Sequence, residues 1–194
     1  MKKALFLFVF IPLYSLAQRL PDEVMPKVRI TEPGRTVVAE IHTVNNEPDI
    51  ENDRFYYWYS SNQIHTTQGG YSGKLLNGLY EEYFTNKNLK VKGEFKKGLK
   101  SGDWKTWNEN GSLADETNWK NGTKSGAFTI YNTDGSIKQT GQYKDNLLNG
   151  KITNYNANGS KEMITYKAGN VVKSKTVPIW KKIPFLHKHK HKDK

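Results

Sequence analysis

A strict 24-residue repeat is the feature that most limits what this chain can fold into. Four segments share the pattern Gly-x-apolar-x-x-aromatic, with an aromatic residue at the first apolar position in three of them, and each begins 24 residues after the one before. They are residues 78–83, 102–107, 126–131 and 150–155. A fifth segment, 54–59, keeps the aromatics but lacks the Gly. A fixed period of this length indicates a stack of supersecondary units in which each unit contacts only its neighbours.

Each unit is expected to form one β-hairpin. The aromatic strand is followed by a dipeptide that suits a type I′ turn, because Asn, Asp and Gly accept positive φ. These dipeptides are Asn110-Gly111, Asp134-Gly135 and Asn158-Gly159. A second strand follows, for example 112–119, and a wider turn at 120–125 leads to the next unit. In that turn Gly98, Gly122 and Asn146 occupy one register position, which predicts a left-handed backbone there.

Side-chain parity assigns the aromatics to the two faces of the sheet. Trp104 and Trp107 are separated by an odd number of residues, so in a regular strand they lie on opposite faces. Leu113 and Trp119, on the second strand, share parity and are expected on one face. A ribbon this thin cannot bury both faces, so part of the aromatic set is expected to stay exposed.

The aromatic positions of the units form the candidate binding face, because exposed rows of aromatics are typical of protein-binding or sugar-binding surfaces. Its members are Tyr56, Tyr80, Trp104, Phe128, Tyr83, Trp107, Tyr131 and Tyr155. The same residues are also explained by packing within the ribbon, and both interpretations stay open at this stage. A protein partner needs a contiguous apolar patch or an open ribbon edge, whereas a glycan needs solvent-facing rings beside polar side chains.

The repeat predicts an all-β fold, an elongated ribbon of about five antiparallel hairpins in a single-layer twisted sheet. Before it, residues 18–53 form an extension with short strands at 28–30 and 37–44 and loops between them. The predicted parts are a signal peptide at 1–17, the extension at 18–53, five hairpin repeat units at 54–77, 78–101, 102–125, 126–149 and 150–172, and a basic tail at 173–194.

The N-terminal segment 1–17 has the features of a secretory signal peptide. Lys2 and Lys3 precede an apolar run, and Ser15-Leu16-Ala17 places small residues before the expected cleavage at Gln18. The chain has no Cys, so disulfides, thiol catalysis and Cys-based zinc sites are excluded. An exported protein is therefore predicted, whether periplasmic, associated with the outer membrane or secreted.

The net charge of +11 is concentrated at the C-terminus. From Ser174 onward there are seven Lys and one Asp, a local +6, and two charges belong to the leader, so 18–173 carries only +3. A nucleic-acid-binding domain concentrates positive charge on its folded face, so a nucleic-acid partner is not expected. The tail combines Trp180 and Phe185 with a Lys run, a composition that suits an anionic membrane surface. The tail residues with this candidate role are Trp180, Lys181, Lys182, Phe185, Lys188, Lys190 and Lys192. A last strand that caps the ribbon is the alternative.

No catalytic, cofactor or metal site is predicted. Ser72 lies in a Gly-rich turn that lacks the Gly-x-Ser-x-Gly spacing of a nucleophile elbow. The acidic stretch 49–53 begins like a calcium loop, but Arg54 and Ser60 stand where that loop needs Gly and Glu. His187, His189 and His191 alternate with Lys, whose charges oppose metal binding. The sequence therefore favours a protein that is not an enzyme.

The repeat unit, with its Asn-Gly turn and a strand that ends aromatic-Lys-x-Gly, resembles the MORN-repeat variant family. In particular it is similar to bacterial proteins labelled YwqK-family antitoxins. The resemblance covers 56–169, about two thirds of the mature chain. Two departures are visible: Lys87 stands where the turn Gly is expected, and one residue is deleted near Tyr166.

The resemblance implies a hairpin ribbon that binds proteins or membranes and has no activity of its own. Combined with the leader, it predicts an exported protein-binding or scaffolding module that contacts another envelope protein or itself. A module that binds cell-wall glycan through its aromatic ladder is one alternative. An antitoxin-like partner of a toxin is the other, and it requires that the leader is not cleaved.

Overall fold

The computed structural model describes residues 26–172, and every regular element in that range is a β-strand. Twelve strands form one long sheet and three form a small one. The long sheet contains β1 (Lys27–Glu32), β2 (Arg35–Glu40), β6 (Gly78–Phe84), β7 (Leu89–Lys96), β8 (Leu99–Trp107), β9 (Leu113–Lys120), β10 (Thr123–Tyr131), β11 (Ile137–Lys144), β12 (Leu147–Leu148), β13 (Gly150–Tyr155), β14 (Lys161–Lys167) and β15 (Asn170–Val171). The small sheet contains β3 (Phe55–Ser60), β4 (Gln63–Gln68) and β5 (Lys74–Leu75).

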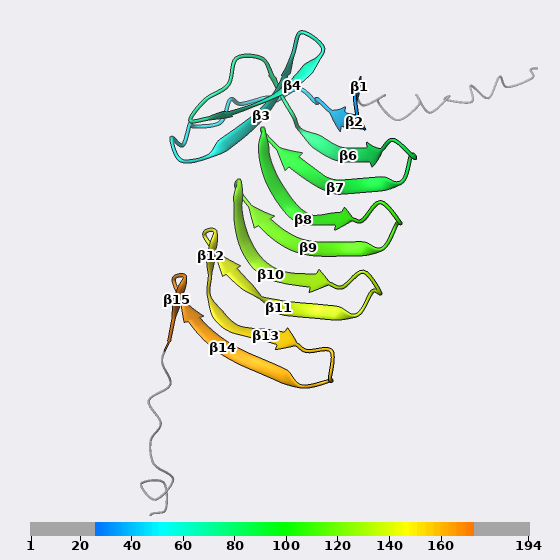
Figure 1. The fold of residues 1–194 in the computed structure, drawn as a ribbon. Coiled ribbons are helices and arrows are strands. Elements are labelled where there is room, and N and C mark those ends of the chain that lie inside the picture. The colour runs from blue at the N-terminus through cyan, green and yellow to red at the C-terminus, as the bar shows by residue number, and fades with distance from the viewer. Residues whose placement is uncertain (1–25, 173–194) are drawn as a thin grey trace, which may run out of the picture.

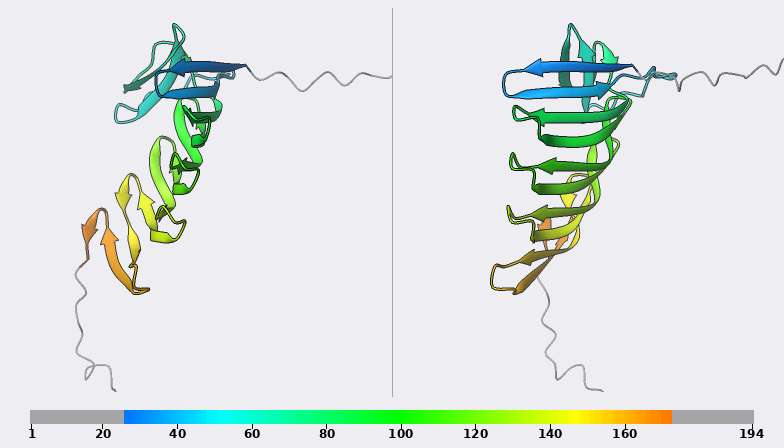
Figure 2. Two further views of the ribbon diagram at one scale, coloured as in Figure 1. Left: turned by 45° about the vertical axis from the view of Figure 1, so that its right-hand side comes forward. Right: turned by 90° about the vertical axis from the view of Figure 1, so that its right-hand side faces the viewer.

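The long sheet is a ribbon of hairpins, as predicted. Its strands run in the order β1-β2-β6-β7-β8-β9-β10-β11-β13-β14-β15, with β12 paired to β11, and neighbouring strands are antiparallel. Figure 1 shows the hairpins stacked like rungs, and the side views of Figure 2 show that the stack is elongated. The sheet is not closed on itself, because β1 and β14–β15 lie at its two ends.

The unit predicted at 54–77 forms a hairpin, but that hairpin lies outside the ribbon. β2 takes the place beside β6, where Ala39 pairs with Tyr80. The strand expected at 28–30 lies within β1, and the strand expected at 37–44 is observed as β2, which begins earlier and already ends at Glu40; together they form the first rung.

The reason for this difference is the run of aromatics in β3. Tyr56 is buried in one cluster, while Tyr57 and Tyr59 pack against the core of the ribbon. Packing onto the ribbon covers the face that carries Tyr57 and Tyr59. Val44 and Tyr71 pack against the cluster of Tyr56 on the opposite face, so both apolar faces of the hairpin are covered. The first rungs therefore carry a second layer, and the predicted single layer is correct only for the later hairpins (Figure 2).

Type I′ turns lie at the end of the hairpins opposite to the one predicted. In Asn121-Gly122 both residues have positive φ, 47° and 77°, and Asp145-Asn146 has 49° and 68°. This is the pattern of a two-residue type I′ turn. The left-handed backbone predicted at Gly98, Gly122 and Asn146 is confirmed.

The Asn110-Gly111 turn is longer, because only Gly111 has positive φ, 85°. The Asn108 N–H donates to the Ser112 carbonyl at 2.9 Å, and the Gly111 N–H donates to the Asn108 carbonyl at 2.9 Å. Asn110 Oδ1 accepts from the Ser112 N–H at 3.0 Å, which holds Asn110 on the negative-φ side. The result is a three-residue loop with a left-handed Gly at its end. Lys87 has φ 68° at the equivalent position, so the missing Gly does not change the turn.

A bulge beside this turn corrects one predicted face. Trp107 pairs with Leu113 and Thr106 pairs with Asp115, so β9 has one extra residue between the two pairs. Trp119 pairs with Gly102 and lies on the face of Trp104, whereas Leu113 lies on the face of Trp107. The last hairpin has no bulge, because Tyr155 pairs with Lys161 without a register shift. The one-residue deletion seen in the sequence near Tyr166 therefore falls beside Lys161, where the other hairpins have their bulge.

We call the face that carries Trp104 the inner face and the face that carries Trp107 the outer face. The main core lies where the small sheet covers the inner face of the first rungs. Phe95 and Trp104 pack edge to face with ring centroids 4.9 Å apart, and Tyr80 packs on Phe95 at 5.3 Å. Between residues 26 and 172 no helix has the length and apolarity needed to cross a membrane.

Candidate functional site

The first apolar position of each ribbon unit, which is aromatic in three units and Ile152 in the fourth, lies on the inner face and is buried. The exposed fractions are 9% for Tyr80, 4% for Trp104, 3% for Phe128 and 1% for Ile152, and Tyr56 of the separate hairpin is fully buried. Glycines make room for these rings: a Cβ at Gly93 would lie 2.3 Å from the Trp104 ring. Half of the predicted binding face is therefore core, because its rings pack against neighbouring backbone. These residues are Tyr56, Tyr80, Trp104 and Phe128.

The second aromatic position lies on the outer face and stays partly exposed. The four side chains follow one another at one per rung of the ribbon, and each comes from the end of a first strand. They are Tyr83, Trp107, Tyr131 and Tyr155. Their separation from the buried row follows the alternation of side chains along a strand, as the sequence predicted. We call these four residues the outer aromatic row.

Charged side chains hold the phenol groups of the outer aromatic row. Tyr131 Oη donates to Glu116 at 2.9 Å, and Lys105 Nζ lies 2.5 Å from the same carboxylate. The hydrogen bond from Lys105 is the main cause that lowers the pKa of Glu116. Two rungs away Tyr83 Oη donates to Glu81 at 2.7 Å, and this bond raises the pKa of Tyr83. The rings of Tyr83 and Tyr131 are thus held in place, although both side chains remain partly exposed.

A polar hollow of about 270 Å³ lies beside Glu116, the hydrogen-bond partner of Tyr131. Its outer-face walls are polar side chains of β8 and β9 together with Thr129 of β10. They include Asp103, Lys105, Glu116 and Asn118, and Asn118 Nδ2 donates to Asp103 at 2.8 Å. The hollow combines charges of both signs, and one of its carboxylates, Glu116, also accepts from the Tyr131 phenol.

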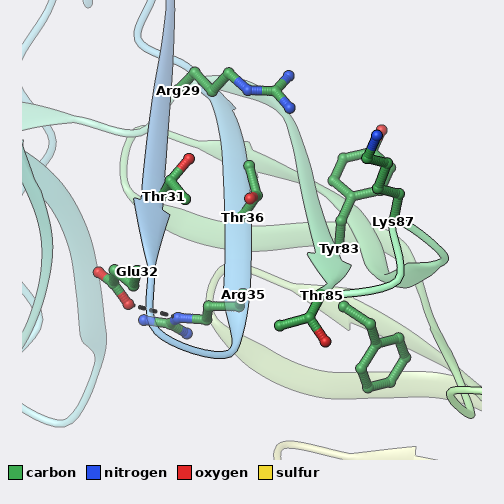
Figure 3. A pocket seen from close by; sticks show the side chains of 9 residues that line it. Arg29, Thr31, Glu32, Arg35, Thr36, Tyr83, Thr85 and Lys87 are labelled. Atoms are coloured by element: carbon green, nitrogen blue, oxygen red, sulfur yellow. Dashed lines mark hydrogen bonds and ion pairs between the residues drawn. The ribbon is translucent and has the colours of Figure 1, made fainter.

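A second basin, of about 410 Å³, lies where the outer aromatic row meets the first hairpin (Figure 3). Thr36 pairs with Thr31 on one side and with Tyr83 on the other, so the three side chains share the outer face. Arg29 and Lys87 line the same basin. Sequence reasoning missed it because residues 54–77, and not the β1–β2 hairpin, were expected beside β6.

Two lysines alternate with aromatic rings along the inner face. Lys100 Nζ lies 4.1 Å from the ring centroid of Trp104, 4.8 Å from that of Trp119 and 5.7 Å from that of Tyr57. Lys124 Nζ lies 5.1 Å from the Tyr143 ring. Burial is the main cause that lowers the pKa of Lys100 to about 8, and the charge of Lys124 adds to it. The ring faces favour the ammonium form and offset part of this cost.

Lys100 should make stability depend on alkaline pH. Between pH 8 and 10.5 the unfolded chain holds a proton that folded Lys100 has released, so the free energy of unfolding rises with pH in that window. We expect a rise of about 1–3 kcal/mol from this group. Urea melts at pH 7.5 and 10 test it: the Lys100→Met variant should gain most over the wild type at pH 7.5. A constant difference between the two proteins at both pH values would contradict the expectation.

The buried carboxylate of Glu82, in the first rungs of the ribbon, is paired with charged and polar side chains. Glu82 Oε1 lies 2.8 Å from Lys90 Nζ, and its Oε2 accepts from Tyr80 Oη at 3.1 Å and lies 3.6 Å from Arg35 Nη1. Burial and the Glu82 charge raise the pKa of Tyr80. These partners satisfy the charge of Glu82, so the group serves to fix the core.

The acidic stretch at 49–53 is tied into the structure by its neighbours. Arg54 Nη2 lies 3.2 Å from Glu51, and Arg54 also pairs with Asp53. Tyr56 Oη donates to the Asp49 carbonyl at 3.3 Å. Within 26–172 no three His, Asp or Glu side chains gather as a metal site would require. The predicted leader at 1–17 and the candidate membrane-surface tail from Trp180 to Lys192 lie outside the described residues.

The arrangement defines a class of protein: an open ribbon of stacked β-hairpins whose surface presents one partly exposed aromatic residue per repeat. Residues 76–97, 100–121 and 124–145 match the family model described as MORN repeat variant, so these three repeats of the ribbon are MORN repeat variants. No curated protein matches the chain. The family model says nothing about the YwqK-labelled proteins, and that finer resemblance stays a prediction. MORN repeats are often modules that bind proteins or membranes.

Proposed function

We propose that this protein is an exported binding module of the cell envelope, without enzymatic activity, that contacts another envelope protein through the outer aromatic row. The observation that carries the proposal is the placement of Tyr83, Trp107, Tyr131 and Tyr155 on one face, one per rung and each partly exposed.

Three features support this assignment. Two of the four rings are held by charged partners, Tyr83 by Glu81 and Tyr131 by Glu116, which lowers the entropy cost of fixing them on binding. Large aromatics in fixed positions supply much of the energy of protein interfaces. The expected leader at 1–17 would deliver the ribbon to the envelope, and the Gly-rich turn around Ser72 lacks the spacing of a nucleophile elbow.

The test compares matched variants in capture from the native envelope. Mature protein beginning at Gln18 is immobilised, incubated with an extract of its own cell envelope, and the retained proteins are identified by mass spectrometry. Trp107→Ala and Tyr131→Ala should reduce the retained partner by at least about tenfold, because anchoring aromatics dominate such interfaces. Tyr143→Ala is the control, since Tyr143 is equally half-buried but packs on Phe128 at the inner face.

Urea melts of the same variants separate binding from folding. Trp107→Ala should retain most of the stability, because one side of its ring already faces solvent. Equal retention by Trp107→Ala and wild type would remove the proposed face. Recovery of the native protein in the cytoplasm with its leader intact would remove the envelope assignment.

Glycan binding is the second candidate, favoured by the polar hollow beside Glu116, the partner of Tyr131. Its Asp103, Lys105 and Asn118 side chains supply polar groups on the face that carries the outer aromatic row, the combination that sugar sites use. Co-sedimentation with purified cell wall distinguishes the two functions. Pelleting of the wild type but not of Trp107→Ala, without a captured protein, would assign the outer face to glycan.

A further inference from the structure

Among residues 26–172, the last full strand of the ribbon has one edge that is paired and one that is mostly unpaired. β14 pairs with β13 along its whole length, from Tyr166 opposite Gly150 to Lys161 opposite Tyr155. On its other side β15 pairs only with Tyr166 and Lys167. Met163, in the middle of β14, is 62% exposed, and Val171 is 56% exposed. An open edge of this kind invites pairing with another strand.

β15 is the beginning of one more repeat. Its geometry copies that of β12, the short strand that leads into β13. The Asn149 N–H donates to the Gln142 carbonyl at 2.9 Å, and at the equivalent place in the next unit the Val172 N–H donates to the Thr165 carbonyl at 2.7 Å. The paired residues repeat with the same offset: Tyr143 with Leu148 becomes Tyr166 with Val171, and Lys144 with Leu147 becomes Lys167 with Asn170.

The repeat also fixes what the next pairs would be. After β12 the chain continues as β13, which pairs with β11 through Thr140 opposite Thr153 and Gln139 opposite Asn154. Each β15 pair is a β12 pair shifted by the same number of residues in both strands. The same shift applied to the two β11–β13 pairs places Met163 opposite Thr176 and Glu162 opposite Val177. The sequence continues from Val172 as far as Lys194, which is enough to supply this strand.

We propose that residues 173–177 of this chain occupy the open edge of β14 as the final strand of the ribbon, with Thr176 opposite Met163. The residue types fit this position. Thr176 stands where Thr153 stands one repeat earlier, and Pro178 follows directly after the last expected pair. A Pro at that point ends the strand, because it has no N–H to donate.

The same segment explains why the ribbon ends here. Lys175 takes the place of buried Ile152, so the inner row of apolar side chains ends in an ammonium group. An inward-pointing charge on an edge strand discourages another hairpin from adding to it. The tail thus divides in two: a capping strand up to Val177, and the basic segment after Pro178 that carries Trp180 and Phe185.

Engineered disulfides test the register directly, since the chain contains no Cys. Residues directly opposite on antiparallel strands are close enough for a disulfide. Met163→Cys combined with Thr176→Cys should cross-link within one chain under mild oxidation, read as a single cross-linked peptide by mass spectrometry. Met163→Cys combined with Val177→Cys is the matched control, because Val177 lies on the opposite face and should not cross-link efficiently.

Hydrogen exchange of the full mature chain supplies a second readout. Amides of 161–164 should exchange at least about tenfold faster in Thr176→Pro than in the wild type, while Lys182→Pro should leave them unchanged. Cross-links between two chains would assign the edge to a second copy and overturn the proposal. It is also overturned if neither Cys pair cross-links and Thr176→Pro leaves exchange unaltered, which would mean an edge open to a partner strand. None of these outcomes depends on the outer aromatic row.

Discussion

Replacement of Trp104 by alanine is expected to lower the free energy of unfolding by about 3–5 kcal/mol, the usual cost of removing a well-packed aromatic. The ring is 4% exposed and packs against Tyr80 and Phe95 from the preceding rung. It also covers Gly93 and lies under the ammonium of Lys100. Its loss therefore loosens the contacts of two rungs with each other and with the small sheet.

Tyr155→Ala provides the comparison for this prediction. Tyr155 lies in the last hairpin, on the outer face, and remains partly exposed. A terminal unit of a repeat stack supports one interface, whereas a central unit supports two. Urea melts should place the loss for Tyr155→Ala below about 2 kcal/mol, because its ring is only partly removed from water. Losses of similar size in the two variants would contradict the stacked ribbon.

Gly93→Ala is expected to destabilise the protein by about 3 kcal/mol, although it adds a single methyl group. A Cβ at this position would lie 2.3 Å from Cδ2 and 2.4 Å from Cε2 of Trp104. The indole is enclosed by other rings and cannot move aside without opening the core. Thermal or urea unfolding of the variant measures the loss.

Two further variants separate the clash from the general cost of replacing a glycine. Gly135 has φ 83° and nothing within 4 Å of a built Cβ, so Gly135→Ala should cost only about 1–2 kcal/mol, through backbone strain. Adding Trp104→Leu to Gly93→Ala should relieve the clash, so the double variant should lose less than the sum of the two single losses. Additive losses would show that Gly93 and Trp104 do not share a contact.

The repeat made the ribbon predictable, because its period and parity are properties of the backbone. The 24-residue spacing identified the hairpins, and the odd separation of Trp104 and Trp107 placed them on opposite faces. The positions of the type I′ turns were predicted at the wrong end. Asn110-Gly111 has the composition of such a turn, but Asn110 Oδ1 bonds to Ser112 and favours a longer loop.

The neighbours of the first rung were not predictable, because they depend on long-range pairing. Nothing in residues 27–40 repeats the 24-residue pattern, yet β2 pairs with β6. The hairpin at 54–77 matched the aromatic pattern, but it has apolar residues on both faces and packs against the core instead of pairing with β6. The outer aromatic row was correctly separated from the buried row. The environment of Lys100 could not be predicted, because it depends on the position of Tyr57 in the small sheet.

The pairing of β2 with β6 has a consequence for the order in which the protein folds. Ala39 and Tyr80 are separated by the whole small sheet along the chain, whereas the later rungs pair residues close in sequence. An isolated hairpin such as β1–β2 is marginally stable, so it remains without a partner until β6 has been made. Closing that loop carries an entropy cost that the later hairpins do not have. We therefore expect the rungs from β6 onward to form first, and the docking of the N-terminal hairpin to limit the rate.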